Sequence, residues 1–370
     1  MTNLAVLGAN GFIGSRITEM FALSEGIELR PIVRDYVSLA RASRFDLDSR
    51  VADAFDQEAL ERAFQGCDVI VHAVAGDIKT ILGTLSPVYQ AAQEAGVKRL
   101  VYLSSGSVHG QSPQPGTDER SALSDRQVLP YNNAKVRAER TLSKLRNQGE
   151  VELVILRPGI VFGPRSSWVI NFADALLARQ ASLLNRGDGI CNSLYVDNLV
   201  HAIYLAATQP AVDREVFLLG DQECVTWADV YYPIAKALEY QLTDLPEGVV
   251  SERDTRHTLS WFERLEPIRG SKPIQGILSI VPHRIRVAAH RAYETIFQPL
   301  GDSMPILPER AQPIISREMA MLYSCRYRLP HSKATRLLGY QPPVSFPEAV
   351  RRTVAWLAFA GYPIKAACIS

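Results

Sequence analysis

Residues 4–14 read Leu4-Ala5-Val6-Leu7-Gly8-Ala9-Asn10-Gly11-Phe12-Ile13-Gly14 and join an apolar run to three spaced glycines. The apolar run predicts a buried strand, and the helix-like segment that begins at Ser15 follows the glycines directly. The first glycine permits a tight turn, the second lets a pyrophosphate approach the backbone, and the third lets helix and strand pack closely. The turn therefore predicts an anion site at a helix N-terminus.

Short apolar runs alternate with amphipathic segments through the first 220 residues, which predicts buried parallel strands joined by crossover helices. The runs are Leu4 to Leu7, Leu29 to Val33, Val69 to Ala75, Leu100 to Leu103, Leu153 to Leu156 and Val216 to Leu219. We therefore predict an α/β protein with a doubly wound parallel sheet of the Rossmann type. Residues 1–165 and 193–219 would form the dinucleotide-binding domain. Residues 166–192 and 220–370 would form a smaller, mostly helical substrate region.

Composition narrows the class of protein. The 370 residues are 47% hydrophobic and carry a net charge of +1, so a folded chain is expected and nucleic-acid binding is not. Five scattered cysteines show no metal-ligand spacing and no disulfide framework, so no metal site is predicted. The sequence has no signal peptide and no membrane span, and a cytoplasmic location is expected.

The turn lacks the Lys-Ser/Thr ending of a nucleoside-triphosphate loop, so a dinucleotide is its expected ligand. The second strand ends in Ile32-Val33-Arg34-Asp35, at the place that meets the adenosine ribose. Arg34 there favours NADP, because a guanidinium pairs with a 2′-phosphate. NAD is the alternative, with Asp35 as the ribose contact or Arg34 as a solvated loop residue. Asp53 is a candidate for the adenine edge, or else a helix N-terminal acid.

Tyr131-Asn132-Asn133-Ala134-Lys135 places a phenol and an ammonium on one helix face. A lysine and an oxidised nicotinamide both favour phenolate, so Tyr131 is expected to exchange a proton with a substrate oxygen near neutral pH. Tyr232 and Lys236 share the spacing, but the serine-ended strand that leads to Ser104-Ser105-Gly106-Ser107 precedes the first pair. We therefore assign Tyr131 and Lys135 to the site, and Tyr232 and Lys236 to structure.

Together these motifs resemble the extended short-chain dehydrogenase/reductase superfamily, also called the NAD-dependent epimerase/dehydratase family. Further matching segments are His72 to Ala75, Leu103 to Gly110, Arg157-Pro158 before Gly163-Pro164, Tyr195 to Asn198, and Lys333 to Pro342 with Trp356 beyond it. The resemblance implies that Ser105 is the catalytic hydroxyl, Tyr131 the acid/base and Lys135 its electrostatic partner and ribose ligand. The implied cofactor-binding residues are Gly8, Asn10, Gly11, Phe12, Ile13, Gly14, Arg34, Asp53, Ala73, Val74, Ala75, Tyr131, Lys135 and Pro158.

The chain departs from the family pattern at two places. Family dehydratases follow the catalytic hydroxyl with an Asp-Glu pair, and this chain has Gly106 and Ser107, so dehydration is not expected. Nucleotide-sugar members usually carry an Asn after the Arg-Pro segment and an Arg before the Tyr-Val-Asp segment. Gly159-Ile160 and Cys191-Asn192 stand there, which counts against a nucleotide-sugar substrate.

The leading prediction is an NADP-dependent reductase or dehydrogenase that moves hydride between nicotinamide and a ketone or secondary alcohol. The alternatives are a nucleotide-sugar epimerase with tightly bound NAD(P) and a non-catalytic NADP-binding scaffold or sensor. The expected partners are a small carbonyl, alcohol or sugar-like substrate and a second copy of the chain, as a homodimer.

The stretch from Gly248 to Ser316 is predicted to close over the nicotinamide end of the site. Within it, Val281 to Phe297 carries basic residues among apolar ones. A solvated basic face on a core helix is the plain interpretation, and an acidic-ligand or membrane-surface helix is the alternative.

Overall fold

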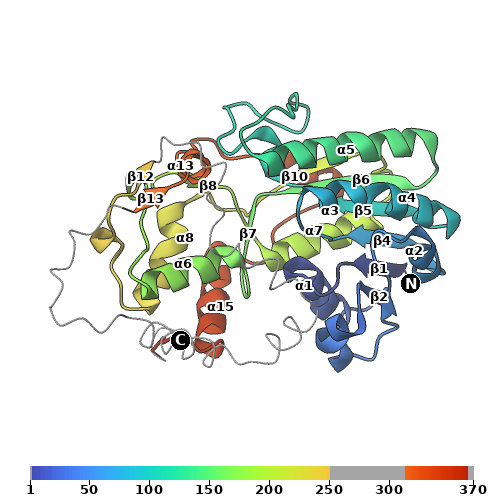
Figure 1. The fold of residues 1–370 in the computed structure, drawn as a ribbon, viewed down its shortest axis with the longest axis horizontal. Helices are drawn as coiled ribbons and strands as arrows, with labels where there is room; N and C mark the ends of the chain where they lie inside the picture. The colour runs from blue at the N-terminus through green and yellow to red at the C-terminus, as the bar shows by residue number, and fades with distance from the viewer. Residues whose placement is uncertain (1, 251–312, 366–370) are drawn as a thin grey trace, which may run out of the picture.

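The structure is a computed structural model in which residues 2–250 and 313–365 are described (Figure 1). The basic segment 281–297 and most of the predicted covering stretch 248–316 lie outside the described residues. The division into two domains therefore stays a prediction.

Seven parallel strands form one sheet in the order β10-β6-β5-β4-β1-β2-β3, which confirms the doubly wound fold. Their bounds are β1 (Thr2–Leu7), β2 (Ile27–Val33), β3 (Arg50–Val51), β4 (Val69–His72), β5 (Arg99–Leu103), β6 (Glu152–Pro158) and β10 (Val216–Leu219). The chain reverses its direction of winding between β1 and β4, where Leu7 pairs with His72. Ligands of such sheets bind at this switch point, beyond the carboxyl ends of the strands.

Helices cover both faces of the sheet (Figure 1). On one face α1 (Phe12–Phe21), α7 (Val196–Thr208) and α14 (Ser332–Leu338) share a buried apolar cluster with the sheet. On the other face lie α2 (Gln57–Phe64), α3 (Ile78–Gly83), α4 (Leu85–Glu94) and α5 (Pro130–Gln148). Both faces are buried, which explains why the strands are near-continuous apolar runs.

A third apolar cluster lies away from the sheet and is built from the later part of the chain. It contains α6 (Ser167–Leu177), α8 (Trp227–Ala237), α13 (Arg317–Tyr323) and α15 (Phe346–Phe359). Short strand pairs flank these helices: β7 (Ile160–Phe162) with β9 (Ser193–Tyr195), β8 (Ile190–Cys191) with β11 (Val225–Thr226), and β12 (Val249–Val250) with β13 (Ile314–Ile315). These two- and three-residue strands are too short to give a period in the sequence.

One predicted strand is shorter in the structure. The apolar run Val69 to Ala75 is strand only as far as His72. The carbonyl of Ala73 and the backbone nitrogen of Val74 lie where a Cβ on Gly8 would come within 3.0 and 3.1 Å. The chain therefore leaves the sheet at Ala73 and packs against the glycine turn.

Candidate active site

The predicted site residues gather at one edge of the sheet. Because the strands are parallel, their carboxyl ends meet at the same edge. Each predicted residue lies at or just beyond the end of a strand or at the start of a helix there: the glycine turn after β1, Arg34 after β2, Asp53 after β3, Ala73, Val74 and Ala75 after β4, Ser105 after β5, Pro158 at the end of β6, and Tyr131 and Lys135 in the first turns of α5.

The glycine turn has the shape that a dinucleotide pyrophosphate needs. Gly8 has φ +90°, a conformation that favours glycine, and a Cβ on Gly14 would lie 2.2 Å from the carbonyl oxygen of Gly8. Helix α1 starts at Phe12 without a side-chain cap, while Asn10 and Gly11 before it are exposed. Its first N–H groups therefore point toward an open site, where an anion is favoured.

Arg165 adds a cation to this turn that sequence reasoning did not find. Its Nη1 donates to Ser15 Oγ at 2.7 Å, and its φ of 73° is unusual for a residue other than glycine. The guanidinium thus lies against the first turn of α1, beside the expected pyrophosphate. Its place directly after Gly163-Pro164 was the available signal, but the contact joins residues 150 positions apart.

Arg34 is the first residue after β2, as predicted, and its side chain is 65% exposed. Asp35 is already engaged, because its Oδ1 accepts from the backbone N and the Oγ of Ser38, at 2.9 and 2.8 Å. Asp35 thereby caps the 3-10 helix η1 (Tyr36–Arg44), and these hydrogen bonds lower the pKa of its carboxyl. Arg34 Nε also lies 3.6 Å from Asp35 Oδ2, so the guanidinium and the carboxylate form an ion pair at the ribose position.

Asp53 is exposed, and its Oδ1 accepts from the backbone N of Phe55 at 3.0 Å. The residue that caps α2 is Asp56, which accepts from the backbone N of Ala59 at 3.0 Å. The alternative interpretation of Asp53 as a helix N-terminal acid is therefore wrong.

Lys135 is buried and held in place at the carboxyl end of β5. It is 4% exposed, and its Nζ donates to the carbonyl oxygen of Leu103 at 2.8 Å and to the hydroxyl of Tyr102 at 3.3 Å. Helix α5 places it there because Pro130 starts the helix and Tyr131 and Lys135 are one turn apart. Burial lowers the pKa of the Lys135 ammonium to about 8.

Tyr131, at the start of α5, is 43% exposed over the whole residue, and Lys135 Nζ lies 6.0 Å from the centre of its ring. Burial around its hydroxyl raises the pKa of Tyr131, and a hydrogen bond with the Ser105 side chain acts in the opposite direction. The expected shift of Tyr131 toward phenolate, which involves both Lys135 and an oxidised nicotinamide, stays a prediction. Lys135 directs its ammonium to Leu103 and Tyr102, and the phenol keeps its proton at neutral pH.

Ser105 belongs to the short helix η2 (Gly106–His109), which it caps. Its Oγ accepts from the backbone N of Ser107 at 3.2 Å and lies 2.9 Å from the Oγ of Ser107. The structure therefore brings Ser105, Tyr131 and Lys135 together. Tyr232 and Lys236 are exposed on α8, in a different part of the molecule.

A buried polar network supports η2 from below. Arg157 and Glu139 form an ion pair at 2.6 Å, with side chains 4% and 6% exposed, and Ser104 donates to Glu139. Arg157 Nη1 also lies 3.0 Å from His109 Nε2. Because each polar group has a partner, this pair holds the end of β5, helix α5 and η2 in fixed positions.

Asn192, one of the departures from the family pattern, is used inside the protein. Its Nδ2 donates to the carbonyl oxygen of Tyr327 at 3.2 Å, and its Oδ1 accepts from the backbone N of Leu329 at 2.8 Å. A Cβ on Gly106 would lie 3.1 Å from Leu329. Asn192 thus holds the segment 327–329 next to Gly106 of η2, and both polar atoms of its amide are engaged.

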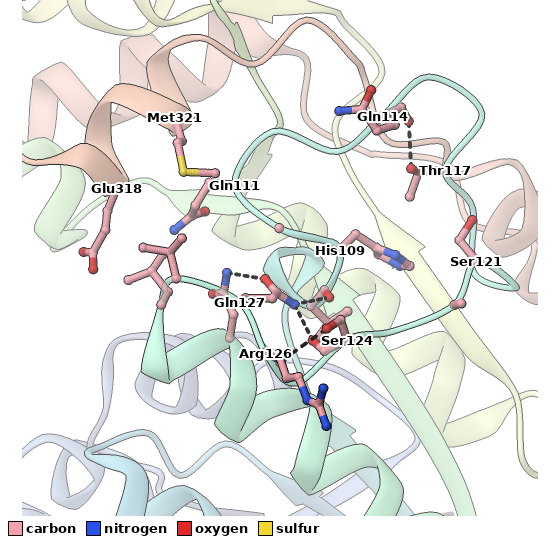
Figure 2. Close-up of a pocket in the computed structure, with 16 residues that line it drawn as sticks. His109, Gln111, Gln114, Thr117, Ser121, Ser124, Arg126, Gln127, Glu318 and Met321 are labelled. Atoms are coloured by element: carbon pink, nitrogen blue, oxygen red, sulfur yellow. Dashed lines mark hydrogen bonds between the residues drawn. The ribbon is translucent and has the colours of Figure 1, made fainter. Parts of the chain in front are cut away.

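A cavity of about 430 Å³ opens next to η2, the short helix that Ser105 caps (Figure 2). Met321 and Glu318 of α13 line one side, and His109 of η2 with Ser124 and Gln127 of the loop before α5 line the other. Residues next to Ser105 and Tyr131 in the sequence, including Val108 and Asn132, complete the wall. The cavity is therefore close to the predicted reacting groups.

Residues 2–250 and 313–365 contain neither a membrane-spanning helix nor a metal-binding cluster. No helix there is both long and apolar enough to cross a bilayer. No cluster of three or more histidine, cysteine, aspartate or glutamate side chains there could hold a metal ion.

Residues 4–220 match the sequence profile of the NAD-dependent epimerase/dehydratase family. The chain belongs to this family. The match spans β1 through β10 and includes every predicted site residue. The prediction of an enzyme is thereby confirmed.

Three curated relatives differ in their reactions. A 2-alkyl-3-oxoalkanoate reductase of Shewanella oneidensis is 24% identical, covering 95% of this chain and 85% of its own. A 3beta-hydroxysteroid-dehydrogenase/decarboxylase of Arabidopsis thaliana is 25% identical over 94% and 78% of the two chains. A UDP-glucose 4-epimerase of Vibrio cholerae is 26% identical over 66% and 78%.

Solved structures share the fold across nearly the whole chain. The UDP-glucose 4-epimerase of Thermotoga maritima, solved with UDP-glucose, has a TM-score of 0.66 at 18% identity, covering 97% of this chain and 99% of its own. The dTDP-glucose 4,6-dehydratase of Bacillus anthracis, solved with NAD, has a TM-score of 0.68 at 15% identity and 97% coverage of both. This likeness confirms the fold.

Proposed function

We propose that this member of the epimerase/dehydratase family is an NADP-dependent reductase that converts a ketone to a secondary alcohol, with Tyr131 as the proton donor. The observation that carries the proposal is the placement of Tyr131, whose phenol hydrogen-bonds with the Ser105 side chain and whose ring centre lies 6.0 Å from Lys135 Nζ. A phenol in this position can give a ketone oxygen the proton that reduction requires. Positions 106 and 107 hold glycine and serine, so no carboxylate stands there for elimination of water.

The residues at the carboxyl ends of the parallel strands could bind a dinucleotide. The uncapped first turn of α1 and Arg165 would hold the pyrophosphate, and Arg34 the 2′-phosphate of NADP. When bound, the dihydronicotinamide supplies the hydride. Tyr131 Oη donates its proton to the carbonyl oxygen, and the hydroxyl of Ser105 donates a hydrogen bond to the same oxygen. Lys135 places a positive charge below the phenol as the proton leaves.

Two of the three curated relatives have names that refer to a ketone or a secondary alcohol as the reacting group. Their alignments cover 95% and 94% of this chain. The epimerase alternative draws on the Vibrio and Thermotoga proteins. The engaged amide of Asn192 disfavours it, because that side chain has no free group to offer a nucleotide sugar.

Turnover of the cofactor tests the proposal. The purified chain is incubated with NADPH and a panel of ketones, and the loss of NADPH absorbance is followed. We expect oxidation of NADPH in step with alcohol formation. Interconversion of UDP-glucose and UDP-galactose without net NADPH consumption would overturn the reductase proposal and favour the epimerase.

A further inference from the structure

The cavity next to η2 is lined by several polar residues, among them Arg126 and Glu318. Two further lining residues, Asn132 and His109, each have a polar atom that the proposed reaction does not use: Asn132 Oδ1 and His109 Nδ1. Asn132 directly follows Tyr131 in the chain, and His109 lies four residues beyond Ser105. Consecutive Cα atoms are about 3.8 Å apart, so the Cα of Asn132 in the cavity wall lies at this distance from the Cα of Tyr131, the proposed proton donor.

The orientation of Asn132 is set by a chain of hydrogen bonds. Gln127 Nε2 donates to the carbonyl oxygens of Val108, at 2.7 Å, and Ser124, at 2.9 Å, so the amide of Gln127 cannot be reversed (Figure 2). Its Oε1 must then accept, and it does so from Asn132 Nδ2 at 2.9 Å. Reversing Asn132 would set two oxygens against each other, so Oδ1 is the atom left over.

Asn132 Oδ1 has no hydrogen-bond donor among the described residues, although Asn132 is 1% exposed. A buried acceptor without a donor costs about 1 to 3 kcal/mol. Such groups are rare in folded proteins, and one in the wall of a cavity indicates a ligand that donates a hydrogen bond.

His109 supplies the opposite polarity. Arg157 Nη1 lies 3.0 Å from His109 Nε2, and a guanidinium can only donate, so Nε2 accepts and the ring proton is on Nδ1. Burial and the charge of Arg157 lower the pKa of His109 to about 4, so the ring stays neutral. Among the described residues no acceptor takes the Nδ1 proton. Besides the charged side chains of Arg126 and Glu318, the cavity therefore offers one fixed acceptor and one fixed donor. The apolar side chains of Val108, Val128 and Met321 complete this part of its wall.

We propose that this cavity binds an apolar arm of the substrate that carries a neutral hydroxyl or amide group, which donates to Asn132 Oδ1 and accepts from His109 Nδ1. The proposal rests on the proposed ketone reduction, since it assigns the part of the ketone that lies beyond the carbonyl. A carboxylate is disfavoured, because it would bring a second acceptor to Asn132 Oδ1.

Three matched ketones test the polarity of the cavity: benzylacetone, its para-hydroxyl derivative and its para-carboxylate derivative. We measure kcat and KM with NADPH, and binding of each ketone to the enzyme–NADP+ complex by calorimetry. The hydroxyl derivative is expected to have a KM about tenfold below that of benzylacetone, which is the value of one added hydrogen bond, with similar kcat. The carboxylate derivative is expected to bind most weakly. Equal constants, or tightest binding of the carboxylate, would overturn the proposal.

The variant Asn132→Leu removes the acceptor and keeps the branched shape of the side chain. The hydroxyl derivative should lose its advantage over benzylacetone, while the matched surface change Asn171→Leu on α6 should keep it. An unchanged advantage in Asn132→Leu would contradict the assignment. If that variant does not fold, Met321→Trp fills the cavity from α13, and the ratio of KM between acetone and benzylacetone should then fall toward one. A ratio of KM between acetone and benzylacetone that stays unchanged in Met321→Trp would also contradict binding of the ketone in this cavity.

Binding and turnover separate this inference from the proposed function. If none of the ketones is reduced but the hydroxyl derivative still binds in a way that depends on Asn132, the reductase proposal fails and the cavity assignment holds. If the ketones are reduced without discrimination among them, the reductase proposal holds and the cavity assignment fails.

Discussion

Tyr131 and Tyr232 form a matched pair of residues, because each precedes a lysine by four positions and they are 43% and 46% exposed. Tyr131→Phe removes only the ionisable hydroxyl, so we expect kcat to fall about a hundred- to ten-thousandfold with cofactor binding retained. Tyr232→Phe should leave kcat within about twofold, because a surface hydroxyl takes no part in the reaction. Equal losses in two folded variants would contradict the assignment of Tyr131.

Lys135 links activity to stability. Burial lowers the pKa of its ammonium from 10.5 to about 8, so the unfolded chain binds more protons between these two pH values. The stability of the wild type should therefore rise with pH across this window, and the penalty for burying the charged amine is fully present below pH 8. Its size is at most about 3 kcal/mol, from about 1.4 kcal/mol for each pH unit.

Lys135→Met should thus gain stability relative to the wild type at pH 7, lose that gain progressively above pH 8, and be inactive. Urea unfolding of the cofactor-free protein at pH 7 and pH 9.5 measures the change. The exposed Lys236→Met serves as the control, with no pH-dependent difference expected. A difference for Lys135→Met that does not vary with pH would show that its ammonium titrates normally.

Arg34 is proposed to select the cofactor. Loss of a guanidinium that pairs with a phosphate costs about 1.5 to 3 kcal/mol, so Arg34→Ala should weaken NADPH binding about ten- to over a hundredfold and leave NADH binding nearly unchanged. Fluorescence titration with both cofactors measures the ratio, and Arg62→Ala on the exposed surface of α2 is the control. A wild type that prefers NADH would refute the role.

At the scale of the element, the turn between β1 and α1 allows a sharp test. An alanine at Gly14 would place its Cβ 2.2 Å from Gly8 O, so the turn must open, at a cost of about 1 to 3 kcal/mol and with loss of cofactor binding. Gly26→Ala is the control, because its Cβ meets nothing within 4 Å and only its φ of +87° is strained. Both variants should lose stability in urea, but only Gly14→Ala should lose NADPH affinity.

Local patterns in the sequence predict the strands that are long enough to show a period. Six apolar runs correspond to β1, β2, β4, β5, β6 and β10, whereas β3, with two half-buried residues, carries no such signal. The early end of β4 depends on packing against Gly8, from a distant part of the chain.

The candidate site likewise contains residues that local motifs predict and contacts that only the folded structure shows. Ser105, Tyr131 and Lys135 stand in short motifs and could be predicted. The contact of Arg165 with Ser15 and the engagement of Asn192 by Leu329 join positions 150 and 137 residues apart, so no local pattern reports them. The proton retained by Tyr131 depends on burial and on where Lys135 points, which also require the folded structure.

For the whole molecule, Tyr340 ties the last part of the chain to the sheet. It is fully buried in the cluster that contains Leu4 and Phe217, and its hydroxyl donates to the carbonyl oxygen of Gly220 at 3.1 Å. Tyr340→Phe should cost about 1 kcal/mol of unfolding free energy, through the lost hydrogen bond, and Tyr340→Ala about 3 to 5 kcal/mol, through the cavity. Urea unfolding compares them. Similar small losses in both variants would mean that the sheet is complete without this segment.

The position of Tyr340 also bears on how the protein is made. Helix α14 and Tyr340 pack in the same cluster as Leu4 and Val6 of β1, so β1 is translated well before the residues that cover it. Until then the nascent chain exposes apolar sheet surface, the condition in which chaperones bind. A stop codon placed before α14 would therefore be expected to yield degraded protein rather than a weakened enzyme, even though the glycine turn, Ser105, Tyr131 and Lys135 would all have been translated.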